Sequence, residues 1–233
     1  MKKTIITILF CILSIVNAQS FGQNKVQYRD FDWKFISSPN FDVYYYGDEI
    51  ELANFTMEAS IEAYEQIAKH LRWNLKKRVS IIVYHSHNEF QQTNVVGVYM
   101  QEGIGGVTEL FKNRVVIPFE GDYKAFRHVI HHELVHAFVN DYIYGGSLKN
   151  MVASSVKVRI PLWMNEGLAE YLASDWDAKS DMWVRDLAIN GGEFPMIQML
   201  GGYWAYRGGQ SVWKFIASKW GNESIAEIFY QIK

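Results

Sequence analysis

The sequence predicts an α+β fold, in which a small and mostly antiparallel N-terminal sheet packs against one long helix and a helical C-terminal half follows. Two patterns lead to this prediction. Runs of β-branched and aromatic residues occur before residue 120, whereas apolar residues at three- and four-residue steps dominate after it. Strands that precede most of the helices, without regular alternation of the two, are typical of α+β domains.

The composition is that of a soluble globular chain long enough to bury a sizeable core. Of the 233 residues, 49% are hydrophobic and 21% are charged, which excludes the disordered and coiled-coil classes. There are four prolines and no Ser/Gly-rich or Pro-rich linker, so we expect a single domain at residues 19–233. The formal net charge of −2 gives no reason to expect nucleic-acid binding.

The first 18 residues have the pattern of a secretory signal peptide. Lys2 and Lys3 precede an apolar run from Ile5 to Val16, and a small residue, Ala18, ends the segment. The run is shorter than the roughly 20 residues needed to cross a bilayer, so we expect cleavage and no transmembrane span in the mature chain. The predicted location of the exported protein is the periplasm, the outer membrane or the extracellular space.

The N-terminal half combines short strand patterns with one amphipathic helix. The aromatic run Phe41–Tyr46 predicts a first strand. Apolar residues at helical spacing predict a helix over Glu49–Leu71, and β-branched residues predict a strand over Val79–Tyr84. Glycines at 97–106 indicate a loop or hairpin, and Arg114–Phe119 is a further predicted strand whose proline suits a sheet edge.

The rest of the chain has helical patterns. Asp122 is a candidate cap for a helix that continues to about Tyr144, where Gly145 and Gly146 would stop it. Four further helices are expected at about Leu162–Ser174, Lys179–Asn190, Tyr203–Trp220 and, capped by Asn222, Glu223 to the end.

The residues from His132 to His136 form an H-E-x-x-H motif inside the helix predicted after residue 122. Residues four apart lie on one helix face with Cβ atoms about 5–6 Å apart, so two imidazoles can bind one ion. Glu133 is one step around the helix and would reach a water on that ion as general base. The single cysteine, Cys11, lies in the signal segment, so a metal would rest on His, Asp and Glu. The alternative is a pair of core histidines bonded to carbonyls.

A second motif lies downstream, where Glu166 and Glu170 stand four residues apart in the largely apolar segment Trp163–Tyr171. Two carboxylates on one apolar face repel each other and lose hydration unless a cation neutralises them. This segment is therefore a candidate source of a third metal ligand. The alternative is a partly exposed helix edge.

These two motifs resemble those of the gluzincin metallopeptidases, which include the peptidase MA-like domains. In that family the first motif supplies two zinc-binding histidines and the catalytic glutamate, and a second helix carries N-E-G-x-A or a related pattern, here N-E-G-L-A-E. The resemblance implies a zincin-type active-site helix, Zn²⁺ bound by His132, His136 and Glu166, and Glu133 as the base. It also implies that Glu170 orients His132.

Weaker resemblances concern the substrate side. Tyr206 lies in Y-R-G-G, similar to the Y-x-K-G of the aminopeptidase branch, which implies an oxyanion-stabilising tyrosine; Tyr203 is its rival, and a core tyrosine is the alternative. Arg207 takes a variable position and receives no role. The G-x-M-E-N loop of that branch is absent, so aminopeptidase specificity is not expected. Glu109 and the strand Arg114–Phe119 are placed at the cleft edge by analogy.

Two expectations concern the remaining chain. Ser147–Ile160 lengthens the gap between the motifs and is expected to form an extra loop. The other histidines are interpreted as ordinary residues outside any second metal site; they are His70, His85, His87, His128 and His131.

The combined prediction is a zinc-dependent peptidase that hydrolyses peptide or protein substrates with a metal-activated water and a glutamate base. The alternative is a catalytically silent, zinc-containing binding module of the cell envelope. The apolar last helix has no terminal cap, and exported peptidase MA-like domains often precede a β-propeller. We therefore expect that the chain is a fragment and that such a propeller follows Lys233.

Overall fold

The computed structural model describes residues 25–97, 99–110, 112–145, 160–174 and 176–232. The expected signal peptide at residues 1–18 lies outside these ranges, as does the expected loop Ser147–Ile160 apart from its last residue. Among the described helices, none combines the length and the apolar character needed to cross a bilayer.

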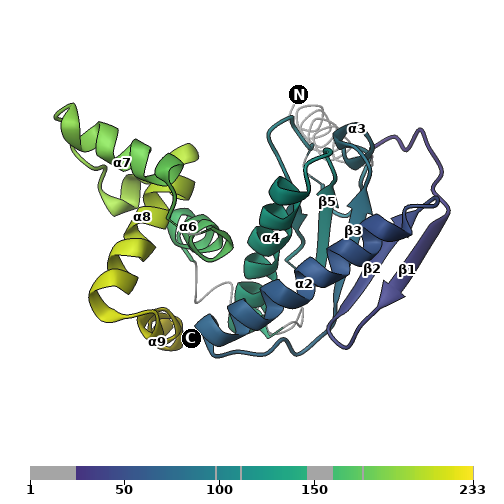
Figure 1. Cartoon of the computed structure of the whole chain (residues 1–233), viewed down its shortest axis with the longest axis horizontal. Coiled ribbons are helices and arrows are strands. Elements are labelled where there is room, and N and C mark those ends of the chain that lie inside the picture. Colours follow the sequence, from purple (N-terminus) through teal and green to yellow (C-terminus); the bar gives the residue numbers. More distant parts are fainter. Residues whose placement is uncertain (1–24, 98, 111, 146–159, 175, 233) are drawn as a thin grey trace, which may run out of the picture.

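A five-stranded mixed sheet forms the N-terminal half (Figure 1). Its strands, in spatial order, are β1 (Trp33–Ser37), β2 (Phe41–Tyr46), β3 (Val79–Tyr84), β5 (Arg114–Pro118) and β4 (Val107–Thr108). The outer pairs β1–β2 and β4–β5 are antiparallel, whereas β2–β3 and β3–β5 are parallel. The α+β prediction is confirmed, and the sheet is mixed rather than mostly antiparallel.

The parallel pairing follows from α2 (Ile50–Leu71), which carries the chain from the end of β2 back to the start of β3, where Phe41 pairs with Val79. A helix between two strands permits parallel pairing, which a tight turn does not. β5 lies inside the sheet and not at its edge. Its proline is the last strand residue, beyond Val115 and Val116, which pair with β4, so the missing N–H removes no bond to β4.

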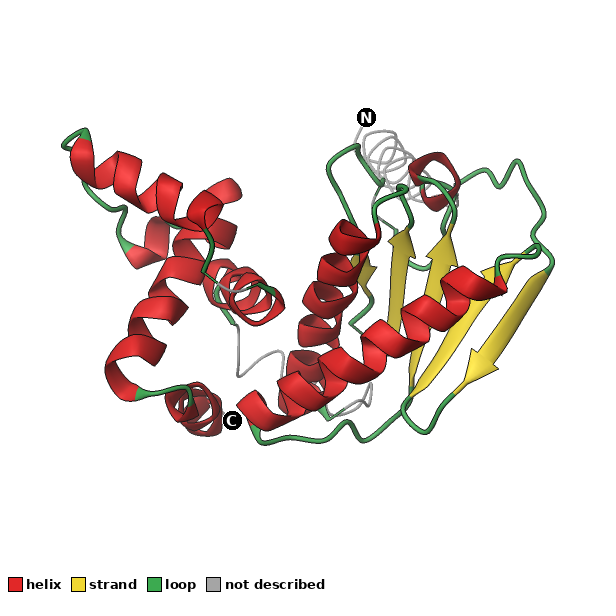
Figure 2. Cartoon of the chain, in the orientation of Figure 1, coloured by secondary structure: helices red, strands yellow, loops and turns green. Residues whose placement is uncertain are grey.

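Two long helices cover one face of the sheet. Figure 2 shows α2 crossing the strands with α4 (Tyr123–Tyr144) beside it. Fully buried side chains of these helices and of the strands form one hydrophobic core; they include Val43, Ile67, Ile81, Ile117, Ile130, Leu134 and Phe138. The other face of the sheet carries a smaller cluster around Tyr84 and Phe90, the latter in α3 (His87–Phe90).

The C-terminal half is helical. Its elements are α6 (Leu162–Ala173), α7 (Ala178–Ile189), the 3-10 turn η1 (Ile197–Met199), α8 (Tyr203–Trp220) and α9 (Glu223–Ile232). In Figure 1, α6 lies between α4 and α8 and packs against both. α6 therefore joins the helical half to the helix that carries the first motif.

The ends of α4 follow the sequence prediction. The Asp122 carboxylate accepts hydrogen bonds from the backbone N–H groups of Lys124 (2.8 Å) and Ala125 (3.1 Å). The helix ends at Gly145, whose φ of 63° is left-handed and suits glycine. Most side chains between the caps are buried, so the motif is held on a rigid element.

Candidate metal centre

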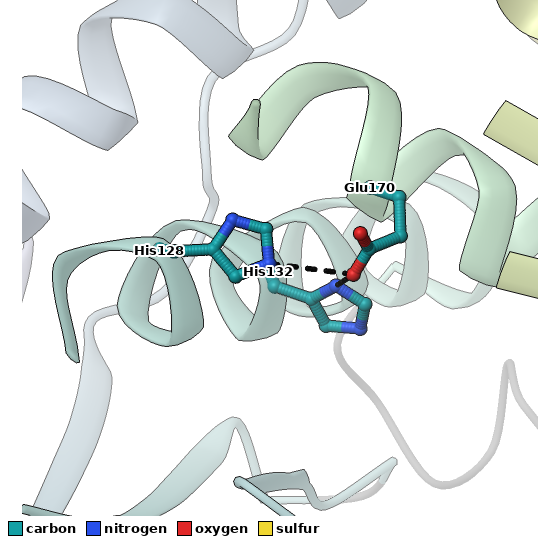
Figure 3. Close-up of side chains that lie close together, drawn as sticks. All are labelled: His128, His132 and Glu170. Atoms are coloured by element: carbon teal, nitrogen blue, oxygen red, sulfur yellow. Dashed lines mark hydrogen bonds and ion pairs between the residues drawn. The ribbon is translucent and has the colours of Figure 1, made fainter. Parts of the chain in front are cut away.

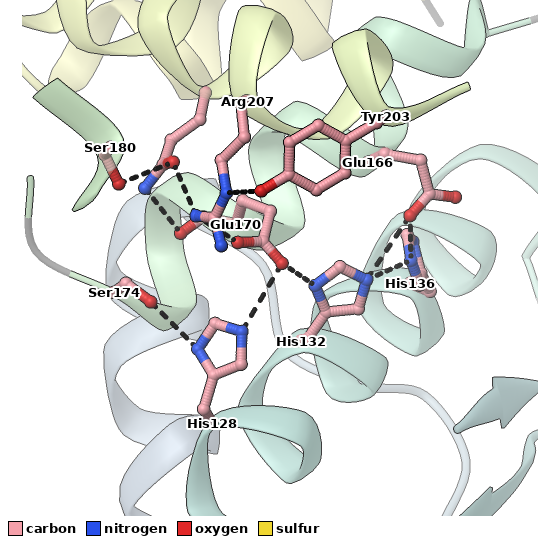
Figure 4. A network of polar contacts seen from close by, with 10 residues as sticks. His128, His132, His136, Glu166, Glu170, Ser174, Ser180, Tyr203 and Arg207 are labelled. Atoms are coloured by element: carbon pink, nitrogen blue, oxygen red, sulfur yellow. Dashed lines mark hydrogen bonds and ion pairs between the residues drawn. The ribbon is translucent and has the colours of Figure 1, made fainter. Parts of the chain in front are cut away.

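Two facing helices carry polar residues at four-residue steps. These residues are His128, His132 and His136 on α4, and Glu166, Glu170 and Ser174 at the facing positions of α6 and its C-terminal cap. The two rows run antiparallel, because His136 contacts Glu166 at one end while the Ser174 hydroxyl lies 2.8 Å from Nδ1 of His128 at the other (Figure 4). The spacing of each motif thus places both rows on facing helix surfaces.

Three of these side chains direct their donor atoms at one point. Nε2 of His132 lies 3.2 Å from Nε2 of His136, and Oε2 of Glu166 lies 3.3 Å and 3.2 Å from these two nitrogens. The three side chains are only 10–13% exposed. The structure therefore brings together the three predicted metal ligands as a group that could hold a metal ion.

The size of this donor triangle fits a tetrahedral ion. Donors at tetrahedral positions about 2.0–2.1 Å from one ion would lie about 3.3–3.4 Å from each other. The observed separations of 3.2–3.3 Å are close to these values. Two imidazoles and one carboxylate also match the donor set of catalytic zinc sites.

The electrostatics of the triangle favour a positive charge at its centre. Burial would raise the pKa of Glu166, but hydrogen bonds from His132 and His136 outweigh it and lower that pKa to about 2. Burial likewise disfavours the imidazolium of His132, yet Glu166 and Glu170 raise the pKa of this histidine to about 10. The buried carboxylate of Glu166 thus requires a positive charge on or between the two histidines, and a divalent ion satisfies the same requirement as a proton.

Glu133 points to the cleft side of α4 and is fixed by the adjacent strand. The hydroxyl of Thr108 in β4 lies 2.6 Å from Oε2 and 2.9 Å from the backbone oxygen of Glu133. A Cβ at Gly106 would lie 2.9 Å from Cγ of Glu133, so a glycine lets the loop approach this closely. Sequence reasoning missed the role of Thr108, because two residues of strand give no recognisable pattern.

Glu170 takes the position expected for a residue that orients His132. Its Oε1 lies 3.1 Å from Nδ1 of His132 and 3.4 Å from Nε2 of His128. Its Oε2 lies 2.9 Å from Nη1 of Arg207, an ion pair in which no N–H points directly at the oxygen. Although burial opposes ionisation, hydrogen bonds from the two histidines hold the pKa of Glu170 well below its usual range. Two residues that received no role from the sequence, His128 and Arg207, thus belong to the site.

A second group that could hold a metal ion consists of His128, His132 and Glu170 (Figure 3). It shares His132 with the first group but would use Nδ1 instead of Nε2. Arg207 already supplies a positive charge at Oε2 of Glu170. A cation there would be repelled by the guanidinium, so the group with Glu166 is the better metal site.

The structure separates the two candidate tyrosines. The ring of Tyr206 stacks over the imidazole of His132, with centroids 6.0 Å apart and planes 13° apart. Burial and the charge of Glu166 raise the pKa of Tyr206 to about 12, which keeps its hydroxyl protonated as a donor. Tyr203 is 48% exposed, and its hydroxyl accepts a hydrogen bond from Nε of Arg207 at 3.3 Å. Tyr206 therefore lies nearer the metal ligands, which its predicted role requires.

Two glycines place α8 against the site. A Cβ at Gly167 would lie 2.3 Å from the carbonyl carbon of Gly209, and a Cβ at Gly209 would lie 2.2 Å from the backbone oxygen of Trp163. Only glycine permits two helices to approach so closely. This contact brings Tyr206 and Arg207 up to the α6 carboxylates.

Two cavities meet at the metal ligands. One, of about 410 Å³, is lined by His128, Tyr203 and Arg207, and the other, of about 470 Å³, by apolar residues such as Met100 and Leu110. Both are also lined by Ile104, Gly106, His132, Glu133 and Tyr206. The candidate site is therefore open on two sides.

The cleft edge differs from the sequence expectation. β4, and not the strand Arg114–Phe119, is the sheet edge beside Glu133. The carboxylate of Glu109 lies 2.5 Å from Nε of Arg114 and lines neither cavity. An interior strand cannot accept a substrate at its edge, whereas β4 has one unpaired edge in the described sheet.

The comparison with known proteins agrees with this geometry. A family model of the peptidase MA superfamily matches residues 59–232, a range that includes both motif helices and α8. The search of curated proteins gave no match. Because the family model spans most of the sequence and the metal-ligand geometry lies inside the matched range, the chain belongs to the peptidase MA superfamily.

Proposed function

We propose that this protein is a zinc-dependent peptidase of the gluzincin type. The observation that carries the proposal is the triangle of His132 Nε2, His136 Nε2 and Glu166 Oε2, with separations of 3.2–3.3 Å beside the Glu133 carboxylate. Three protein donors with one open position are typical of catalytic rather than structural zinc. The family supports the same class of activity.

Each residue has a chemical role in this proposal. Zinc, when bound, would polarise the scissile carbonyl and lower the pKa of a water molecule from 15.7 toward about 7. Glu133 accepts the proton of the attacking water and returns it to the leaving amine. Tyr206 donates a hydrogen bond to the charge that develops on the carbonyl oxygen. Glu170 accepts the Nδ1 proton of His132, which leaves the Nε2 lone pair free for the metal.

The substrate in this proposal is an extended peptide. The unpaired edge of β4 offers backbone groups beside Glu133, and a peptide can add to such an edge as a further strand. The two cavities on either side of the ligands give room for residues on both sides of the scissile bond. This arrangement favours cleavage within a chain. We also propose export of the protein, which the signal-like segment at residues 1–18 supports.

The test measures zinc content and proteolysis together. The wild-type protein should contain one zinc per chain by elemental analysis and should cleave unstructured proteins or internally quenched peptides. A chelator should abolish cleavage, and added zinc should restore it. Zinc-loaded protein that binds such substrates without cleaving them would contradict the proposal and favour a silent binding module.

A further inference from the structure

Arg207 lies beside Glu170, in the wall of the cavity of about 410 Å³. Its side chain is 16% exposed, and its Nη1 lies 2.9 Å from Oε2 of Glu170 and 3.1 Å from Oε1 of Gln210. Its Nε donates to the Tyr203 hydroxyl at 3.3 Å. Figure 4 shows Arg207 on the side of Glu170 opposite to Glu166 and His136. Three polar partners fix the guanidinium in place.

Glu170 contacts a second histidine in addition to His132, the ring that it is proposed to orient. Its Oε1 contacts both His132 and His128, while its own side chain is only 8% exposed. With His128 and His132 it forms a group in which the ligand atoms lie within 4.8 Å of each other. A divalent ion bound by His128, His132 and Glu170 would occupy Nδ1 of His132. The zinc proposed at Nε2 of the same ring could then bind only if the imidazole had lost both of its ring protons.

The positive charge of Arg207 opposes the binding of an ion in this group. The guanidinium stays charged at all physiological pH values, and its hydrogen bonds to Tyr203 and Gln210 hold it beside Glu170. At Oε2 of Glu170 it neutralises the buried carboxylate and repels a second cation. Oε1 is then left to accept from Nδ1 of His132.

We propose that Arg207 is a positioning residue that fixes Glu170 on His132 and keeps a second metal ion out of the group formed by His128, His132 and Glu170. The inference rests on the proposed function, because it assumes that His132, His136 and Glu166 bind one zinc. Arg207 acts through Glu170 and His132 and does not touch the reacting atoms.

The first test compares Arg207→Met with Arg207→Lys and with the control Arg185→Met, an arginine paired with Asp181 on the exposed side of α7. Zinc affinity is measured by competition with a chromophoric chelator, and stoichiometry by elemental analysis after titration with several equivalents. For Arg207→Met we expect zinc binding to be about 10–100-fold weaker, as for other residues that orient a ligand, and a second ion to bind at higher zinc concentration. Arg207→Lys should still bind one ion, and the control should match wild type.

A rescue experiment separates loss of the cation from loss of the fold. In Arg207→Ala, millimolar guanidinium should restore zinc affinity and the stoichiometry of one, whereas sodium at equal ionic strength should not. Far-UV circular dichroism of the metal-free variants reports whether they fold. The Co²⁺-substituted protein adds a spectroscopic readout, because an altered His132 ligand changes the visible absorption.

Three results would overturn the inference. Wild-type affinity and a single ion in a folded Arg207→Met variant would show that Arg207 has no positioning role. Failure of guanidinium to rescue a folded Arg207→Ala variant would do the same. If the variants do not fold, titration of the wild type with zinc decides the question. Two bound ions per chain, reduced to one by His128→Phe, would contradict the inference. A single bound ion would support it. Absence of zinc from the wild type would instead refute the proposed function.

Discussion

Replacement of Gly167 by alanine tests whether close contact of α6 with α8 builds the site. A Cβ at this position would lie 2.3 Å from the carbonyl carbon and 2.5 Å from Cα of Gly209. Carbon atoms in good contact are about 3.5 Å or more apart, so the two helices would have to separate by about 1 Å. Both clashing atoms belong to the backbone, so no side-chain rotation can relieve the clash.

The expected cost follows from two opposing effects. Overpacking of this kind costs about 1–3 kcal/mol, and a backbone clash belongs at the upper end. Alanine in place of glycine inside a helix recovers about 0.5–1 kcal/mol. We therefore expect the free energy of unfolding to fall by about 2 kcal/mol. Zinc affinity should fall as well, because Glu166 and Glu170 lie on the displaced helix.

The assay is urea denaturation of the metal-free protein followed by circular dichroism, with Gly201→Ala as the matched control. A Cβ at Gly201 would meet no atom within 4 Å, so its stability should be unchanged or slightly raised. If Gly167→Ala unfolds at the same urea concentration as Gly201→Ala, the close contact between α6 and α8 does not contribute to stability as proposed.

Three further substitutions test separate parts of the site. His136→Ala removes one of three donors, so elemental analysis should find well below one zinc per chain; a full complement would exclude His136 as a ligand. Thr108→Val removes the hydroxyl that lies 2.6 Å from Glu133, so kcat should fall about tenfold or more with zinc content unchanged, because small displacements of catalytic groups are costly; an unaltered kcat would contradict this. Asp122→Ala removes the cap of α4 and should lower the free energy of unfolding by about 0.5–2 kcal/mol, whereas equal urea midpoints would show that the cap is unimportant.

Sequence periodicity predicted the long helices well because each one carries its own signal, whereas the four residues of α3 and the three of η1 were missed. The cap at Asp122 and the glycine at Gly145 fix the ends of α4 where they were expected. The strands were harder. β1 is mostly exposed and therefore lacks the alternation of a half-buried strand, and β4 has two residues. The parallel pairing of β2 with β3 depends on how α2 packs, which strand patterns do not encode.

In the site too, residues could be predicted where spacing along one helix brings them together, but not where only the packing of separate helices does. His132 and His136 could be predicted because their four-residue spacing on one helix already implies a shared face. The spacing of Glu166 and Glu170 indicated only a source of a third ligand, and the resemblance to the gluzincin motifs singled out Glu166, which the structure places with the two histidines. His128 lies one further four-residue step along the same face, and this signal could have found it. Arg207 could not be found in this way, since its partner Glu170 lies on another helix and only the glycine contact brings the two together.

The most direct test of zinc-dependent peptide hydrolysis compares the wild type with Glu133→Gln at equal zinc content. Both proteins are loaded to one zinc per chain, and their cleavage of one quenched peptide or unstructured protein is measured with and without chelator. We expect chelator-sensitive cleavage by the wild type and almost none by Glu133→Gln, because the amide cannot accept the proton of the water. Equal cleavage by the two zinc-loaded proteins would contradict this expectation.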